Sequence, residues 1–173
     1  MSEKSMRSRV VRSLKALDAI AVENPALPGT PDVNYVEGWI ELKQLTAWPQ
    51  KADTVVRCDI FTPQQRVWHI RRRLAGGTSW LLLQVGREWL LFDGAVAALN
   101  LGLCTRIELR CLAVESNPSP SEKELVRWIS RPQNAFSFGD VEKARLKQMQ
   151  QSTSVSHLAD TFCGKPREDP GPL

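Results

Sequence analysis

The chain has 173 residues, of which 42% are hydrophobic and 24% charged, with a formal net charge of +4. No apolar run approaches the length of a membrane-spanning helix, and the N-terminal segment lacks the apolar stretch of a signal peptide. We therefore expect a cytoplasmic protein with no membrane partner. The mildly basic balance is compatible with a polyanionic partner but does not require one.

The first part of the chain predicts a helix followed by strands. Apolar residues at helical spacing predict a helix over residues 4–17. Residues 19–24 predict a short strand. The apolar and aromatic segment 33–42 predicts two strands, joined at Gly38 by a bulge or a tight turn.

A second helix is expected from Pro63 to Leu74. Thr62 is a suitable N-cap, proline is favoured at the first helical position, and the helix should stop at Gly76–Gly77. We expect three apolar residues on one face and three basic residues on the other: Val67, Ile70 and Leu74, against Arg66, His69 and Arg73.

The remaining elements are predicted in the same way. Two apolar runs around a Val-Gly-Arg-Glu turn predict a hairpin over residues 78–94. A short helix follows at 95–101. Alternating apolar and charged residues predict a strand at 105–115, with Ile107, Leu109 and Cys111 facing inward.

A linker is expected at residues 116–121, followed by helices at about 121–131 and 139–151. This order of elements predicts an α/β (α+β) fold with a mixed central sheet flanked by helices. We divide the chain into a core domain of residues 1–116, a helical extension of residues 117–152 and a disordered tail of residues 153–173.

Two carboxylates and a lysine lie in the segment PGTPDVNYVEGWIELK, residues 28–43. Residues two apart in a strand face the same side, so Glu41 and Lys43 project together. If the two strands pair as a hairpin, Asp32 lies near them. Two carboxylates and a main-chain carbonyl can hold Mg²⁺, and an ammonium group can stabilise charge at phosphorus. The alternative is a solvated hairpin, with Asp32 as a turn residue and Glu41 and Lys43 as an exposed pair.

The segment TPDVNYVEGWIELK resembles the signature of the PD-(D/E)xK nucleases, in its Holliday-junction-resolvase-like and VRR-NUC-like branches. The resemblance implies a restriction-endonuclease-like core, catalytic residues Asp32, Glu41 and Lys43, and Mg²⁺, with Mn²⁺ as a substitute. It also implies metal binding by Asp32, Glu41 and the Leu42 main-chain carbonyl.

Further site residues follow from the same resemblance. The segment FTPQQRVWHIRRRLAGG is similar to the helix after the motif, which carries a glutamine near the site. Gln65 is the better match, and the resemblance implies that it is a catalytic residue that helps to position water or phosphate; Gln64 is the alternative. Many family members carry an acidic residue on the first helix, and Glu3 is the candidate here, with Glu23 as a second option.

The implied function is a metal-dependent DNA endonuclease that acts on branched or recombination-intermediate DNA as a homodimer. A homing- or repair-type endonuclease of the same fold is one alternative, and a non-catalytic DNA-binding module is another. Trp48 is a candidate either for base stacking or for packing. The candidate DNA-binding residues are arginines, which a solvated helix face explains equally well: Arg66, Arg71, Arg72, Arg73, Arg7 and Arg12.

Overall fold

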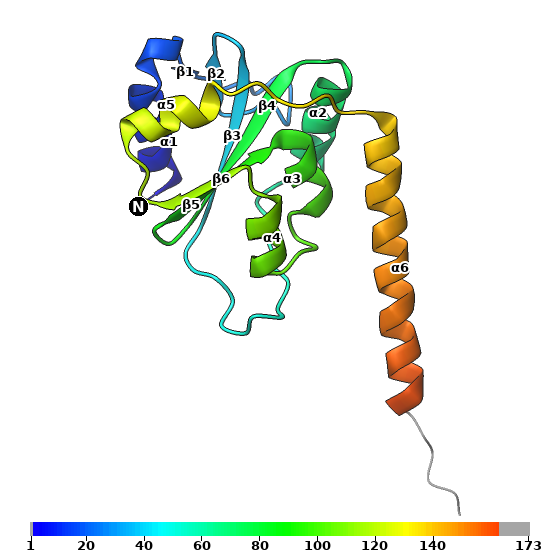
Figure 1. Ribbon diagram of the computed structural model, residues 1–173. Coiled ribbons are helices and arrows are strands. Elements are labelled where there is room, and N and C mark those ends of the chain that lie inside the picture. Colours follow the sequence, from blue (N-terminus) through cyan, green and yellow to red (C-terminus); the bar gives the residue numbers. More distant parts are fainter. Residues whose placement is uncertain (1, 163–173) are drawn as a thin grey trace, which may run out of the picture. The chain divides into compact units, whose positions relative to one another are not determined.

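The computed structural model describes residues 2–162, of which residues 2–137 form an α+β structure around a six-stranded mixed sheet (Figure 1). The strands lie in the sheet in their order along the chain. Neighbouring strands are antiparallel except β3 (Gly38–Leu45) and β4 (Thr78–Val85), which are parallel because helix α2 (Pro63–Leu74) crosses over between them. The strands are β1 (Ile20–Ala21), β2 (Val33–Tyr35), β3 (Gly38–Leu45), β4 (Thr78–Val85), β5 (Glu88–Asp93) and β6 (Glu115–Pro118).

Helices cover both faces of this sheet. Helices α1 and α5 lie on one face and α2, α3 and α4 on the other (Figure 1). A short 3₁₀ turn at Lys15–Leu17 follows α1. The helices are α1 (Glu3–Ser13), α2 (Pro63–Leu74), α3 (Gly94–Asn100), α4 (Arg106–Leu112) and α5 (Glu122–Ile129).

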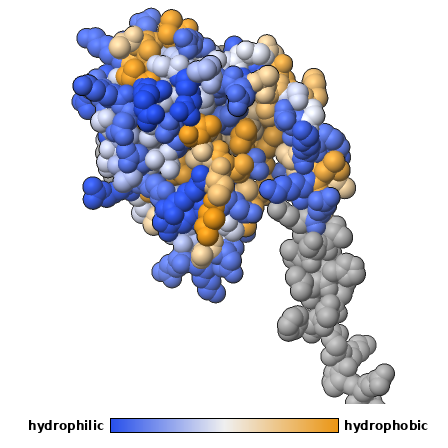
Figure 2. Space-filling view, viewed as in Figure 1, coloured by the Kyte–Doolittle hydropathy of each residue, from blue (hydrophilic) through white to orange (hydrophobic). Residues whose placement is uncertain are grey.

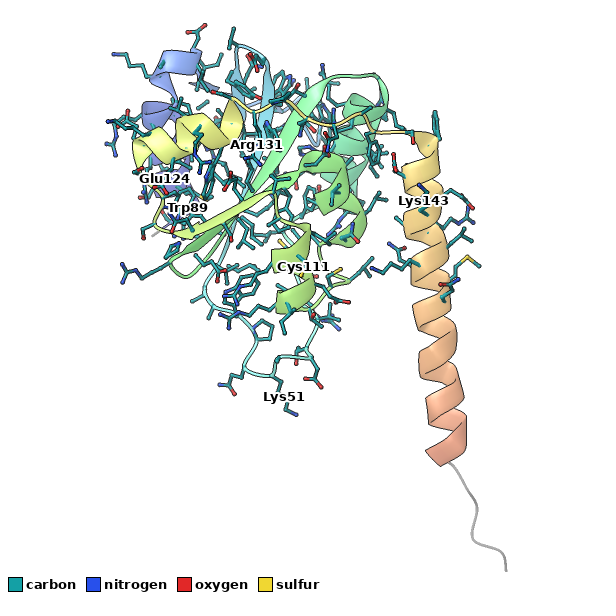
Figure 3. All side chains as sticks on the ribbon, in the orientation of Figure 1. Lys51, Trp89, Cys111, Glu124, Arg131 and Lys143 are labelled. Atoms are coloured by element: carbon teal, nitrogen blue, oxygen red, sulfur yellow. The ribbon has the colours of Figure 1, made fainter. Side chains whose placement is uncertain are left out.

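The core is divided by the sheet into two apolar layers. Ile40, Leu42 and Trp89 pack with α1 and α5, and Trp89 is seen on that side in Figure 3. Leu81 and Phe92 pack instead with α3 and α4. Because side chains alternate along a strand, a sheet covered on both faces has strands that are buried almost throughout, as β4 and β5 are.

The prediction of a strand at residues 105–115 is wrong, because most of this segment forms helix α4. Thr105 and Glu108 form a capping box: the Glu108 carboxylate accepts from the Thr105 amide at 2.8 Å, and the Thr105 hydroxyl accepts from the Glu108 amide at 3.4 Å. Leu109 is buried as expected, but Ile107 and Cys111 are exposed. Cys111 is labelled on α4 in Figure 3. The strand β6 lies slightly later, in the predicted linker, and pairs with β5.

The other predicted elements are present with shifted ends. Helix α2 has the predicted Thr62 cap and starts at Pro63. Helix α5 belongs to the compact unit that extends to Ser137 rather than ending at residue 116. Helix α6 (Phe138–Phe162) belongs to a second unit and is longer than the helix expected there. Residues 163–173 of the predicted tail lie outside the described residues.

Between residues 2 and 162, no helix combines the length and the apolar character needed to cross a bilayer. Figure 2 shows apolar side chains gathered in a strip over α4, where Leu103, Ile107 and Val114 are exposed.

Candidate active site

The β2–β3 hairpin brings Asp32 and Glu41 together. Val33 lies opposite Ile40 in the antiparallel register, so the next step outward brings Asp32 opposite Glu41. The Asp32 carboxylate accepts a hydrogen bond from the Leu42 amide, with Oδ2 at 2.9 Å from the nitrogen. The prediction that a hairpin returns Asp32 toward the Glu-x-Lys triplet is therefore confirmed in its geometry.

Gly29 allows the loop before Asp32 to pack against the start of α2. Its φ of 91° is in the left-handed region that favours glycine. A Cβ atom at this position would lie 2.7 Å from the main-chain carbonyl of Gln64, too close for any other residue. The close approach of loop and helix places the first turn of α2 beside the β2–β3 hairpin.

Glu41 and Lys43 project together from β3 toward the face covered by α2, and both are almost fully buried. The Lys43 Nζ atom lies 2.7 Å from Glu41 Oε1. Because burial removes both charges from water, the ion pair and its hydrogen bonds must compensate for the lost hydration. The alternative of an exposed, solvated pair is excluded by this burial.

Gln65, and not Gln64, reaches Glu41. Its Oε1 accepts from the Thr62 amide at 2.9 Å, as part of the capping box that starts α2. This fixes the direction of the amide group, whose Nε2 donates to Glu41 Oε1 at 2.7 Å. Gln64 is exposed. The helix cap thus orients the side chain that holds the carboxylate.

The two carboxylates impose an electrostatic cost on each other. Burial, and next the negative charge of Glu41, raise the pKa of Asp32 from 3.8 to about 6, although the Leu42 amide and the Lys43 charge oppose the shift. A divalent cation beside both groups would offset the repulsion between the carboxylates and the cost of burying their charge. The oxygen donors suit a hard cation such as Mg²⁺, which keeps several waters and needs few protein ligands. Across residues 2–162, no group of three or more His, Cys, Asp or Glu side chains is arranged to hold a metal.

One residue that the sequence analysis did not select as a site residue, His69, also lies here. His69 is fully buried, with Nδ1 at 2.9 Å from Ser79 Oγ and Nε2 at 3.9 Å from Glu41 Oε2. Burial lowers the pKa of His69 to about 4, so the ring is neutral near pH 7. A Cβ atom at Gly94 would lie 2.3 Å from His69 Nδ1, so glycine is needed there. Gln65 and His69 are four residues apart and therefore lie on the same side of α2, and this spacing could have predicted His69 as a site residue.

The predicted faces of α2 are largely reversed. Val67 is exposed, whereas His69 and Arg73 are buried. The Arg73 guanidinium pairs with Asp93 at 2.9 Å and donates to the carbonyls of Gly77 and Asn134. This burial removes Arg73 from direct contact with DNA and gives it a structural role, since it ties α2 to the ends of β4 and β5.

Arg66 is also engaged within the protein. It donates to the carbonyls of Phe61 and Ala98 and lies over the Phe61 ring, so it links α2 to α3. The remaining candidate arginines lie nearer the surface: Arg71, Arg72 and Arg12 are exposed, and Arg7 pairs with Glu23 at 3.3 Å.

Neither acidic candidate from the N-terminal region joins the site. Glu23 is highly exposed and paired with Arg7, and the side chain of Glu3 lies outside the described part of the structure. Asp93 caps α3, since its Oδ1 accepts from the Ala95 amide. Trp48 donates from Nε1 to Glu88 at 2.8 Å and lies beneath the guanidinium groups of Arg106 and Arg110, which favours packing over base stacking.

Comparison of the sequence with known protein families and with curated proteins finds no match. The function must therefore be argued from the site itself.

Proposed function

We propose that the protein is a Mg²⁺-dependent endodeoxyribonuclease with the PD-(D/E)xK core. One observation carries the proposal, namely the set of contacts around the buried Glu41. Lys43 and Gln65 both contact one oxygen of its carboxylate, and Asp32 lies beside it and accepts a hydrogen bond from the Leu42 amide. The site thus combines oxygen donors for a metal, a fixed cation and a group that orients the carboxylate, which suits metal-assisted phosphodiester hydrolysis.

Each residue has a role that follows from its contacts. Asp32 and Glu41, with the Leu42 carbonyl, would hold Mg²⁺ or Mn²⁺. When bound, the cation would neutralise charge on the scissile phosphate and lower the pKa of a water molecule. Lys43 supplies a positive charge beside the carboxylates, suited to orienting the attacking water or stabilising charge on phosphorus. Gln65 keeps the Glu41 carboxylate in one orientation.

The energetic cost of the arrangement favours catalysis over a purely structural role. A buried ion pair generally stabilises a fold no better than apolar residues of the same volume. Asp32 moreover has a pKa displaced upward, which means that its charged form is disfavoured in the fold. Ionisable groups perturbed by burial and by a like charge cluster at functional sites.

The substrate class follows from the family resemblance and from charge. The resolvase-like motif favours branched or recombination DNA, cut by a homodimer, and the net charge of +4 is compatible with a polyanion. A homing- or repair-type endonuclease with the same fold is the alternative within this class. A DNA-binding module without cleavage is the alternative outside it.

The test is a cleavage assay on plasmid, fork and four-way-junction DNA, with Mg²⁺, Mn²⁺ or EDTA. We expect cleavage that depends on the metal and falls by at least about 100-fold in Glu41→Gln and Lys43→Met, because each variant removes an interaction needed in the transition state. These replacements keep side-chain volume, so the buried site is not emptied.

Matched controls are Glu122→Gln and Lys51→Met, which alter exposed residues of the same types. Both should cleave like the natural protein. Cleavage that survives in the two site variants would contradict the site assignment. Metal-independent binding without cleavage by the natural protein would favour the DNA-binding module.

A further inference from the structure

Two tryptophans and an arginine form a partly exposed cluster beside the candidate active site. The rings of Trp39 on β3 and Trp68 on α2 pack edge to face, with centroids 5.6 Å apart. The guanidinium group of Arg72 lies over both rings, at 4.7 Å from the Trp68 centroid and 5.9 Å from the Trp39 centroid. Both tryptophans are half-buried and Arg72 is exposed. We refer to these three residues as the Trp–Arg cluster.

The chain holds the cluster next to the carboxylates. Trp39 precedes Glu41 by two residues and therefore projects from the same face of β3, about 7 Å along the strand. Trp68 follows Gln65 by less than one helical turn, and its ring contacts His69 with centroids 5.3 Å apart. A nucleotide strand that placed a phosphate at Glu41 would thus bring a neighbouring base within reach of the cluster.

A cavity of about 320 Å³ opens at the cluster. Its walls include Trp39, Arg72 and the starts of β3 and β4. A Cβ atom at Gly77 would lie 2.5 Å from Arg72 Cδ, so glycine gives the arginine side chain room in its present position. The volume is at the lower end of the range for ligand pockets and is sufficient for one aromatic base.

The charges around the cavity suit a base with its phosphate rather than a phosphate alone. Arg72 brings a cation that lies over the Trp68 ring; a guanidinium group can stack with a base and attract the phosphate backbone. Asp18 and Glu37 also line the cavity. Carboxylates repel phosphate but accept hydrogen bonds from the amino groups of bases. A base in a duplex is already stacked and paired, so it cannot enter such a cavity without being unpaired first.

We propose that the Trp–Arg cluster and its cavity bind an unpaired base next to the scissile phosphate, so that the preferred substrate is DNA with single-stranded character at the cleavage position. This inference rests on the proposed nuclease function. It deepens that function by assigning a substrate-selecting site to residues outside the catalytic motif.

The first experiment measures binding alone. The natural protein is mixed in EDTA with a duplex that contains a short bubble carrying 2-aminopurine, or with the fully paired duplex as a reference. We expect quenching of the unpaired 2-aminopurine on stacking, and a loss of quenching with about tenfold weaker binding to the bubble in Trp68→Leu and Arg72→Gln. Gly77→Ala, which displaces Arg72 but leaves both tryptophans, should also reduce the quenching and weaken binding to the bubble.

The controls are Trp48→Leu and Arg87→Gln. Trp48 also lies beneath arginines, but in the loop after β3, and Arg87 is exposed in the β4–β5 turn. Both control variants should quench 2-aminopurine as the natural protein does. Circular dichroism verifies that each variant is folded. If Trp68→Leu does not fold, Arg72→Gln and Gly77→Ala decide the matter, since both change the cluster without emptying it.

The second experiment separates this inference from the proposed function. With Mg²⁺, the natural protein should cleave the bubble faster than the duplex, and the bubble-to-duplex ratio should fall about tenfold in Arg72→Gln. No cleavage of any DNA, combined with quenching that depends on Trp68, would refute the nuclease and support the base-binding site. Cleavage with the same bubble-to-duplex ratio in the natural protein and in the cluster variants would overturn the inference of a base-binding site and leave the proposed nuclease function intact.

Discussion

The replacement Asp32→Asn should stabilise the metal-free protein while abolishing cleavage. The raised pKa of Asp32 means that its ionised form is disfavoured in the fold relative to the unfolded chain. An amide has no charge to bury beside Glu41, and its oxygen can still accept the hydrogen bond from the Leu42 amide. The replacement therefore removes a repulsion and keeps the local contact.

The magnitude follows from the two pKa values. Raising the pKa of Asp32 from 3.8 to about 6 corresponds to at most about 3 kcal/mol above pH 6, where the group is ionised in both states. As the pH falls from 6 to 3.8, the folded protein is protonated at Asp32 before the unfolded chain is. The stabilising effect of the replacement should therefore shrink over this window and vanish below it.

The measurement is urea unfolding of both proteins in EDTA at several pH values between 4 and 8. The exposed control Asp53→Asn should change the free energy of unfolding by no more than about 0.5 kcal/mol at any pH. Addition of Mg²⁺ should stabilise the natural protein more than Asp32→Asn, because the cation has lost a ligand in the variant. The reasoning would be refuted if Asp32→Asn were less stable than the natural protein at pH 8, or if its free energy of unfolding changed by the same amount at every pH.

Three further outcomes are expected. The His69 imidazole should remain neutral to below pH 5 in an NMR titration. Its contribution to the free energy of unfolding, about 3 kcal/mol, should be present above pH 6.5 and lost as the pH falls through 4. An imidazole that titrates near pH 6.5 would contradict its burial. Arg73→Ala should lower the free energy of unfolding by about 3 kcal/mol or more, since it leaves the Asp93 carboxylate without its partner, whereas the exposed Arg71→Ala should have little effect in the same urea titration. Thr105→Ala should cost about 1 kcal/mol through loss of the α4 cap, and an unchanged thermal midpoint would show that the cap does not stabilise the helix.

Elements with strong local signals were predictable from the sequence. The Thr62 cap, Pro63 and the glycine pair correctly predicted where α2 begins and ends. The alternation in β3 placed Glu41 and Lys43 on one face, which the structure confirms. These predictions succeeded because capping and strand geometry depend on residues only a few positions apart.

The segment at 105–115 shows where local reasoning failed. Its alternation of apolar and charged residues is compatible with a strand, but the Thr105 and Glu108 capping box stabilises a helix instead. Once this segment is helical, only Leu109 needs to be apolar, because it alone is buried. A period of two in a short segment was thus outweighed by a hydrogen-bonding pattern at spacing three.

By itself, the sequence determined the order of most elements and the pairing of Glu41 with Lys43 on one strand face, because both follow from backbone period and end caps. Only the tertiary structure decided which glutamine reaches the carboxylate, that His69 and Arg73 are buried, and that the Trp–Arg cluster borders the site. These depend on contacts between residues that are distant along the chain: Gln65 with Glu41, Arg73 with Asp93, and Trp39 with Trp68. Burial, and the pKa shifts it causes, exist only after those elements pack together.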